Sequence, residues 1–194
     1  IGVELLLIIT ILQYIKYYLL ILFMKIDKYE IKKFIGEGQF GIVYAGINII
    51  TNKKVAIKKC NKHLSNFKNE IKICNHLRNI KGVYRLHWFG TIDNYKYLVI
   101  DRLGPSLSHY LAIHKQFDQY SINYIAIKLI TILEAIHLKG IIHRDIKLDN
   151  ILVDYETKEE IYLIDFGLAK SIYNKSNTHI KQETNKSIVG TPNY

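Results

Sequence analysis

Two short strings in the second half of the chain constrain it more than any other feature. They are IIHRDIKLDN, which ends at Asn150, and LIDFG, which ends at Gly167. The first string places a carboxylate and an ammonium, Asp145 and Lys147, close to the amide of Asn150. The second adds the carboxylate of Asp165. Carboxylate and amide oxygens suit Mg²⁺, and an ammonium suits phosphate. The strings therefore predict a site for magnesium and a phosphate chain, and two polar turns bounding a buried hairpin are the structural alternative.

The order of these residues resembles the signature of protein kinases, in which an H-R-D loop with its Asn is followed by D-F-G. The resemblance implies that Asp145 orients the attacking hydroxyl and accepts its proton. Lys147 resembles the lysine with which Ser/Thr kinases contact the transferring phosphate. Asn150 and Asp165 are the expected magnesium ligands. His143 is expected to be a structural buttress, because Asp145 already supplies the base.

A glycine-rich turn lies near the start of the kinase-like part, with the pattern GxGxxGxV between two predicted strands. Glycines allow backbone amides to approach a triphosphate without an intervening side chain. A dinucleotide-binding turn would be followed by a helix, whereas the run from Ile42 to Tyr44 indicates a strand. The residues expected to bind ATP here are Ile35, Gly36, Glu37, Gly38, Gln39, Phe40, Gly41 and Val43.

The string VAIK, which ends at Lys58, resembles the third strand of kinases. Lys58 is expected to reach the α- and β-phosphates, and Ala56 joins the predicted ATP-binding set. In isolation Lys58 would read as an ordinary surface lysine. A helix is predicted over 67–77, with apolar residues on one face. Its only carboxylate, Glu70, is the expected ion-pair partner of Lys58.

Two apolar runs, 83–89 and 97–100, predict strands that complete the first lobe. They lead to a break at Gly104 and Pro105, where Ser106 can cap the next helix. A hinge between two lobes is expected at this break. The residues expected around the adenine of ATP are Ile100, Asp101, Leu103 and Leu152.

The clearest predicted helix spans 121–140, with Ser121 as its cap and Gly140 at its end. Its apolar stripe is expected to be core, and the helix is expected to deliver the catalytic loop. The runs 151–153 and 161–164 flank a polar turn and predict a short hairpin. This hairpin would hold the two magnesium ligands.

Two further strings, LHWFG at 86–90 and LGPSL at 103–107, resemble the casein kinase 1 family within the protein kinases. In that family a lysine and an arginine of the activation segment bind an acidic or prephosphorylated substrate. Lys186 falls at the place of the lysine, but Asn193 stands where the arginine is expected. The GTP-x-Y string is closer to the general kinase form, so another Ser/Thr group is the alternative. Arg144 is a candidate partner for a phosphate on the activation segment.

Residues 1–23 are strongly hydrophobic, with Glu4 and Lys16 as their only charges. The stretch 5–23 is long and apolar enough to be a transmembrane helix. The lysines that follow would then hold the rest of the chain on the cytoplasmic side. However, Met24 stands directly before the kinase-like start, so translated upstream sequence or a fragment boundary is the other explanation.

Composition indicates a globular chain, because 49% of its 194 residues are hydrophobic and 23% are charged. The net charge of +10 comes from lysines spread along the chain, and no aromatic-basic module accompanies them. A nucleic-acid partner is therefore not expected. Cys60 and Cys74 show neither a CxxC motif nor metal-site spacing, so a reducing compartment is expected.

These features predict an α+β, protein-kinase-like fold with two lobes. The predicted divisions are a hydrophobic segment at 1–23, a β-rich N-lobe with the hinge at 24–103, and a partial helical C-lobe at 104–194 that ends in the activation segment. The resemblance implies a monomeric Ser/Thr protein kinase that uses ATP and Mg²⁺ on a protein substrate. It is expected in the cytoplasm or nucleus, or on a membrane if 1–23 is an anchor. The alternatives are a non-catalytic nucleotide-binding scaffold and an inactive, truncated product.

Overall fold

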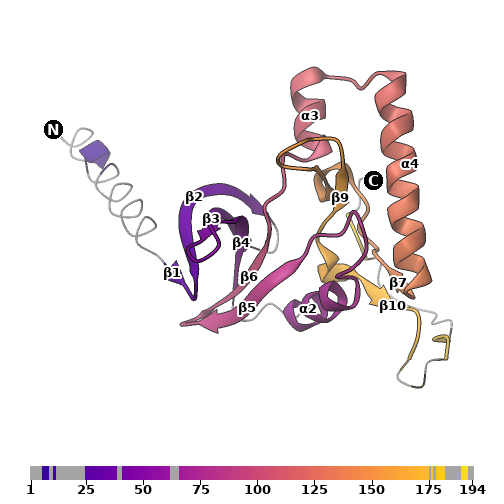
Figure 1. The fold of residues 1–194 in the computed structure, drawn as a ribbon, viewed down its shortest axis with the longest axis horizontal. Helices are drawn as coiled ribbons and strands as arrows, with labels where there is room; N and C mark the ends of the chain where they lie inside the picture. The colour runs from indigo at the N-terminus through magenta and orange to yellow at the C-terminus, as the bar shows by residue number, and fades with distance from the viewer. Residues whose placement is uncertain are drawn as a thin grey trace. The chain divides into compact units, whose positions relative to one another are not determined.

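The computed structural model of this chain describes residues 6–8, 11, 25–38, 41–61, 66–174, 176, 178–181 and 189–191 (Figure 1). Contacts divide it into two compact units. Unit 1 consists of Ile1–Lys62 and Trp88–Arg102, and unit 2 of His63–His87 and Leu103–Tyr194. Residues 63–87 group with the second unit, and the chain enters that unit again between Arg102 and Leu103. The predicted division into lobes stays a prediction.

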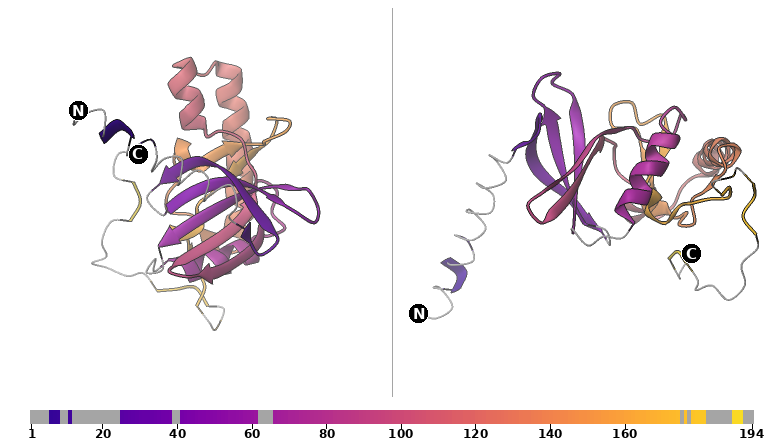
Figure 2. Two further views of the ribbon diagram at one scale, coloured as in Figure 1. Left: turned by 90° about the vertical axis from the view of Figure 1, so that its left-hand side faces the viewer. Right: turned by 90° about the horizontal axis from the view of Figure 1, so that it is seen from below.

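Unit 1 is built on one six-stranded sheet that curls strongly, as Figure 2 shows. In the order in which they lie side by side, its strands are β1 (Lys25–Ile26), β2 (Tyr29–Gly38), β3 (Gly41–Asn48), β4 (Lys54–Asn61), β6 (Tyr95–Asp101) and β5 (Leu86–Ile92). The pairs from β1 to β4, and β4 with β6, are antiparallel. Two shifts of register in β2 mark irregularities that bend this strand.

The core of unit 1 lies on one face of this sheet. Alternate residues of each strand point to that face, because side chains along a strand project to opposite sides. The buried cluster consists of Ile26, Tyr29, Ile31, Tyr44, Val55, Ile57, Tyr97 and Val99. The β-branched and aromatic residues of this cluster fit a pleated, half-buried surface. The strands predicted around the glycine-rich turn and the VAIK string are therefore confirmed.

Unit 2 combines three helices with two small sheets. The helices are α2 (Phe67–His76), α3 (Leu107–His114) and α4 (Gln119–Leu138). The paired strands are β8 (Ile151–Val153) with β9 (Ile161–Leu163), and β7 (Ile141–Ile142) with β10 (Lys170–Ser171), and the short 3₁₀ helices are η1 (Leu148–Asn150) and η2 (Phe166–Leu168). The predicted helix at 67–77 and the predicted hairpin of β8 and β9 are confirmed.

Helix α4 begins two residues earlier than predicted. Asp118, not Ser121, is its cap, because an Asp118 carboxylate oxygen accepts a hydrogen bond of 2.6 Å from the Ser121 amide. The predicted end is confirmed, since Gly140 follows the helix with a φ of +72°. The cap of α3 is also as predicted, with the Ser106 hydroxyl accepting from the His109 amide at 3.2 Å.

The strand predicted from residue 83 begins only at Leu86. The residues before it pair elsewhere: Val83 forms a single parallel bridge with Leu163, and the Gly82 carbonyl accepts a hydrogen bond of 2.8 Å from the Leu163 amide. The first part of the apolar run therefore pairs with β9 of the β8–β9 hairpin, and its second part forms β5. Hydrophobic periodicity reflects local structure, so it does not predict that one apolar run will pair with two different segments.

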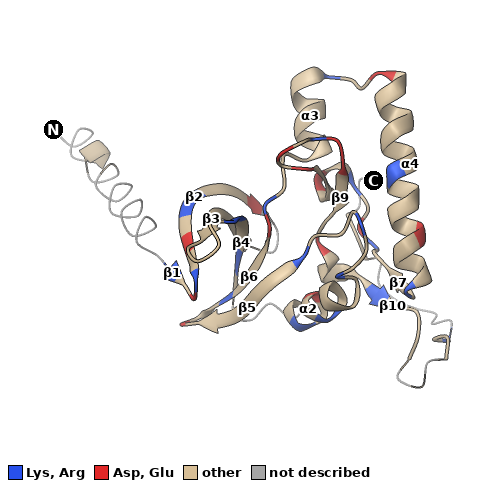
Figure 3. Ribbon diagram, in the orientation of Figure 1, with Lys and Arg blue, Asp and Glu red and all other residues tan. Residues whose placement is uncertain are grey.

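A carboxylate in the β8–β9 connection ties that hairpin to two other parts of unit 2. Glu160 lies 2.7 Å from the Lys81 ammonium and 3.0 Å from that of Lys128 on α4. Figure 3 shows the acidic connection and the single basic position midway along α4. These ion pairs lower the pKa of Glu160 below its usual value. Because they lie at the surface, they position α4 more than they stabilise it.

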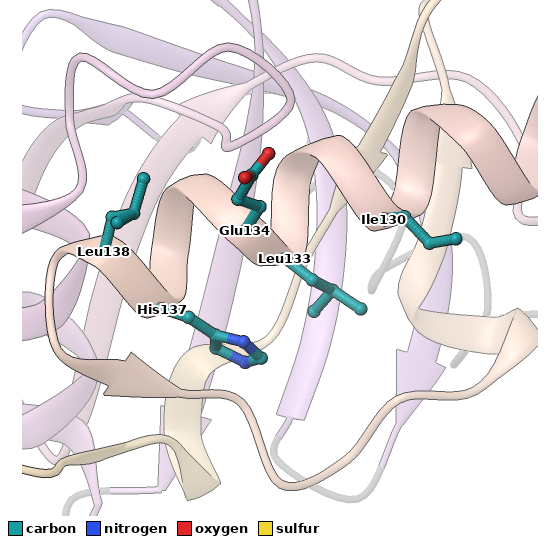
Figure 4. Close-up of a pocket in the computed structure, with 5 residues that line it drawn as sticks. All are labelled: Ile130, Leu133, Glu134, His137 and Leu138. Carbon is teal, nitrogen blue, oxygen red and sulfur yellow. The ribbon is translucent and has the colours of Figure 1, made fainter.

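Helix α4 buries little of its apolar surface. Ile132 and Ile136 are its buried residues, whereas Ile127 and Ile130 are both 66% exposed. Figure 4 shows a shallow hollow on this helix, lined by Ile130, Leu133, Glu134, His137 and Leu138. Among the described residues α4 is the one helix long and apolar enough to span a membrane, a test that core helices of soluble proteins also pass.

We expect Gly82→Ala to destabilise unit 2. Gly82 has a φ of +85°, and an added Cβ would lie 2.4 Å from the Ile132 side chain in α4. An L-residue with positive φ and an overpacked neighbour together should lower the free energy of unfolding by about 2–4 kcal/mol. Urea denaturation followed by circular dichroism measures this change.

The matched control for this prediction is Gly36→Ala. No atom lies within 4 Å of a Cβ added at Gly36, and its φ is not positive. The control should change the free energy of unfolding by at most about 0.5 kcal/mol. Equal midpoints for the two variants would contradict the prediction.

Candidate active site

The loop that carries Asp145 is built on a strained turn at the end of α4. After Gly140 the chain forms β7 and then reaches Arg144, which has a φ of +71°. That conformation is unfavourable for a residue with a Cβ and persists only where other contacts hold it. Here the Arg144 guanidinium donates a hydrogen bond of 2.7 Å from Nε to the Leu168 carbonyl.

His143 fixes the loop from inside. Its ring is buried and packs edge-on against Phe166, with 5.0 Å between ring centres. Nδ1 accepts a hydrogen bond of 3.2 Å from the Asp145 amide, and Nε2 lies 2.9 Å from the Ile164 carbonyl. A neutral ring with its proton on Nε2 satisfies both contacts. Burial lowers the pKa of His143 despite the hydrogen bond to Ile164, so the ring acts as the buttress that the sequence predicts.

Asp145 is a buried carboxylate, 6% exposed, with three hydrogen-bonding partners. One oxygen, Oδ1, accepts from the Thr191 hydroxyl at 2.7 Å. The other, Oδ2, accepts from the Asn150 amide at 3.0 Å and lies 3.1 Å from the Lys147 ammonium. Lys147 also donates to the Thr191 hydroxyl at 2.7 Å, which closes a triangle of the three side chains.

These contacts decide the charge of Asp145. Burial by itself would raise its pKa, because desolvation disfavours the charged form. The hydrogen bonds from Thr191, Lys147 and Asn150, together with the Lys147 charge, outweigh burial and lower the pKa below its usual value of 3.8. Asp145 is therefore an ionised carboxylate that is largely shielded from solvent.

The peptide groups of Ile164 join the two strings that carry the candidate ligands. Its amide donates a hydrogen bond of 2.9 Å to the Asn150 carbonyl, and its carbonyl accepts from the His143 ring. The next residue, Asp165, has a φ of +66° and accepts from the Gly167 amide at 3.4 Å. The β8–β9 hairpin thus sets Asp165 directly after a residue that is bonded to Asn150.

The donor set fits magnesium. The Asn150 side-chain nitrogen donates to both the carbonyl and the carboxylate of Asp145, which assigns its amide oxygen as the atom available to a cation. With the carboxylate of Asp165 this makes two hard oxygen donors. In the described part of the chain no group of three or more His, Cys, Asp or Glu could hold a metal. Mg²⁺ would therefore need phosphate oxygens and water in addition, which is its usual manner of binding.

The helix that bears Glu70 is fastened within unit 2. The Asn69 side-chain amide donates to the Ala169 carbonyl at 2.9 Å, which ties α2 to the segment after Asp165. Glu70 is 2% exposed, and one of its oxygens accepts from the Tyr84 hydroxyl at 3.3 Å. Glu70 is thus buried beside the segment that carries the candidate metal ligands.

The other residues predicted to bind ATP are distributed over both units. Unit 1 holds Ile35, Gly36, Glu37, Gly38, Gly41, Val43, Ala56, Lys58, Ile100 and Asp101, and unit 2 holds Glu70, Leu103 and Leu152. Gln39 and Phe40 lie outside the described residues, as do Met24, Lys186 and Asn193. The nucleotide pocket and the ion pair of Lys58 with Glu70 stay predictions.

Two residues of this region were not predicted from the sequence as part of the site. Thr191 belongs to the GTP-x-Y string, from which only the kinase group was predicted, yet its hydroxyl touches both Asp145 and Lys147. The place of this threonine in the kinase-like GTP-x-Y string was a signal from which it could have been identified. Tyr84 precedes a strand without any motif, so nothing in the sequence pointed to it.

A comparison with family models identifies the family of this chain. The model for the protein kinase domain matches residues 29–194, from the first residue of β2 through the catalytic loop and the D-F-G string to the last residue. The match confirms the predicted fold class, a two-lobe kinase fold with a β-rich first part. The chain belongs to the protein kinase family.

Proposed function

We propose that this protein is an active, ATP-dependent protein kinase that phosphorylates serine and threonine hydroxyls. The observation that carries the proposal is the ionised Asp145 carboxylate, held by Lys147, Thr191 and Asn150. A base that stays charged at neutral pH, next to a fixed ammonium, is what phosphoryl transfer to a hydroxyl needs.

In the proposed reaction the acceptor hydroxyl donates a hydrogen bond to Asp145, whose two oxygens offer more acceptor positions than their present partners use. A bond forms between the hydroxyl oxygen and the γ-phosphorus of ATP, and the bond from that phosphorus to the β–γ bridging oxygen breaks. The hydroxyl proton passes to Asp145, and ADP leaves with the electron pair. Lys147 lies 3.1 Å from Asp145 and would offset the charge on the transferring group.

Asn150 and Asp165 are the residues proposed to hold magnesium. Bound Mg²⁺ supplies positive charge that neutralises the phosphate oxygens. The hydrogen bond between the Ile164 amide and the Asn150 carbonyl fixes the separation of the two ligands along the backbone. The glycine-rich turn and Lys58 are the proposed contacts of the ATP phosphates, and Ile100, Asp101 and Leu103 those of adenine.

The proposed acceptor is a serine or threonine of a protein, because Lys147 stands where Ser/Thr kinases carry their lysine. The strings LHWFG and LGPSL favour a casein kinase 1-like enzyme, and GTP-x-Y favours another Ser/Thr group. We further propose a monomer in the cytoplasm or nucleus, or at a membrane if residues 1–23 are an anchor.

One observation favours a second function, that of a non-catalytic nucleotide-binding scaffold. Helix α4 presents Ile127, Ile130 and Leu138 to solvent, and apolar surface of this extent is typical of a binding surface. A scaffold would bind ATP and use α4 to dock a partner, without turnover.

Replacing Asp145 tests the catalytic proposal. We expect Asp145→Asn to lower kcat by about 10²–10⁴-fold, because the amide cannot accept the proton. The KM for ATP should change little, since Asp145 faces the acceptor. Transfer of labelled phosphate from Mg-ATP to casein and to basic peptides measures both constants.

The control for this test is Asp118→Asn, which makes the same chemical change at the exposed cap of α4. Asparagine caps a helix as well as aspartate does, so this variant should keep the parental rate. Equal rates for Asp145→Asn and the parent would overturn the catalytic proposal.

The pH dependence of the reaction tests the role of Thr191. Its hydrogen bond helps to lower the pKa of Asp145, so Thr191→Val should raise that pKa. The acid limb of kcat/KM for the peptide should then move to higher pH by up to about one unit. Thr131→Val, at an exposed position of α4, is the control. It shows how the ionisation of ATP and peptide alone changes kcat/KM with pH. Coincident acid limbs for Thr191→Val and the control would contradict this role.

Thermal denaturation with and without Mg-ATP separates the two proposed functions. At 100 times its dissociation constant the nucleotide should stabilise the protein by about 2.7 kcal/mol. Stabilisation accompanied by turnover supports the kinase, and stabilisation without turnover supports the scaffold. The absence of any shift would contradict both.

A further inference from the structure

Tyr84 is a buried residue of unit 2 that no motif explains. In the sequence it follows α2 and precedes β5. It is 1% exposed, and its hydroxyl contacts two side chains of α2. Cys74 Sγ lies 3.1 Å from the hydroxyl oxygen, and a carboxylate oxygen of Glu70 lies 3.3 Å from it. Glu70 and Cys74 are four residues apart, so both project from the same face of the helix.

The chemistry of these groups fixes the direction of the hydrogen bonds. The Tyr84 hydroxyl has a single proton, and it donates this proton to the Glu70 carboxyl oxygen. The thiol of Cys74 then donates to the Tyr84 oxygen. Burial raises the pKa of Tyr84 well above its usual value, with the nearby Cys74 and Glu70 adding to the effect. The hydroxyl therefore stays protonated at neutral pH and can act as a donor.

Burial makes the contact with Glu70 important. The carboxylate is 2% exposed, and a buried charge without hydrogen bonds is strongly unfavourable. The Tyr84 ring cannot move freely, because it packs against Phe166 with 6.0 Å between ring centres. Phe166 directly follows Asp165. Tyr84 thus connects the carboxylate of α2 to the segment that carries a candidate metal ligand.

We infer that Tyr84 is a positioning residue that holds the Glu70 carboxylate in place before any nucleotide binds. The inference rests on the proposed function, in which Glu70 directs Lys58 toward the phosphates of ATP. A donor that is buried and anchored by its own ring presents the carboxylate in one orientation. The Glu70 side chain is then already ordered when ATP binds, so binding does not include the entropy cost of ordering it.

Tyr84→Phe is the variant that tests this inference, because it removes only the hydroxyl and keeps the ring on Phe166. We expect the dissociation constant and the KM for Mg-ATP to rise about tenfold, since hydrogen bonds to charged groups are among the stronger ones. The KM for the peptide should stay at the parental value. A merely structural role would lower the folded fraction, and hence the apparent kcat, without moving the KM for ATP.

The control is Cys74→Ala, which removes the other hydrogen bond of the Tyr84 hydroxyl and leaves the donor to Glu70. This variant should bind Mg-ATP with the parental affinity. In a Glu70→Gln background, Tyr84→Phe should have a much smaller effect, because the charged acceptor is gone. Circular dichroism confirms that each variant is folded.

Calorimetric titration with Mg-ATP and steady-state kinetics decide the outcome. A parental dissociation constant for Tyr84→Phe would overturn the inference and leave the proposed function intact. An equal loss of affinity in Tyr84→Phe and Cys74→Ala would also overturn it, since that pattern indicates general loosening of α2. A parent that binds Mg-ATP without turnover would overturn the catalytic proposal alone, whereas a parent that binds no nucleotide would overturn both.

Discussion

The candidate site depends on one constraint, which is that its polar groups are buried and must therefore be hydrogen-bonded. Among the described residues the buried polar or charged side chains are Asn48, Glu70, His143, Asp145 and Asn150. Four of these five lie in the candidate site. A buried carboxylate without partners would be protonated or expelled. The contacts that keep Asp145 ionised are thus also the contacts that give the loop its shape.

The backbone of this region follows from the same constraint. Arg144 and Asp165 both have positive φ, at +71° and +66°, although neither is glycine. Such conformations persist only where neighbouring contacts impose them. The bond from Arg144 to the Leu168 carbonyl and the two bonds to the peptide groups of Ile164 impose them here. The strain is local and is offset by hydrogen bonds that cross between the two strings.

Helix α4, unlike the loop around Asp145, is held mainly by contacts at its ends and its surface. Only Ile132 and Ile136 of this helix are buried. Asp118 caps its start, and Glu160 forms an ion pair with Lys128 in its middle. Its exposed apolar residues, among them Ile127, Ile130 and Leu138, are accessible to another molecule or segment. The loop that carries Asp145 follows this helix after the short strand β7.

The sequence by itself indicated that this chain is a protein kinase, which the family model confirms. The H-R-D and D-F-G strings predicted Asp145, Lys147, Asn150 and Asp165 as site residues, because their residue types and spacing suit phosphoryl transfer. It also predicted most helices and strands, since apolar periodicity reports local structure directly. It misjudged the cap of α4, where Asp118 and Ser121 are equally good capping types and only the local geometry chooses between them.

Only the tertiary structure decided the partners of those residues. Thr191 reaches Asp145 across 46 positions of sequence, and Tyr84 reaches Glu70 across 14, so no local pattern connects either pair. The run after residue 82 likewise reads as one strand but divides between Leu163 and the sheet of unit 1. Hydrogen bonds among buried groups depend on which segments pack together, and that information lies in the fold as a whole.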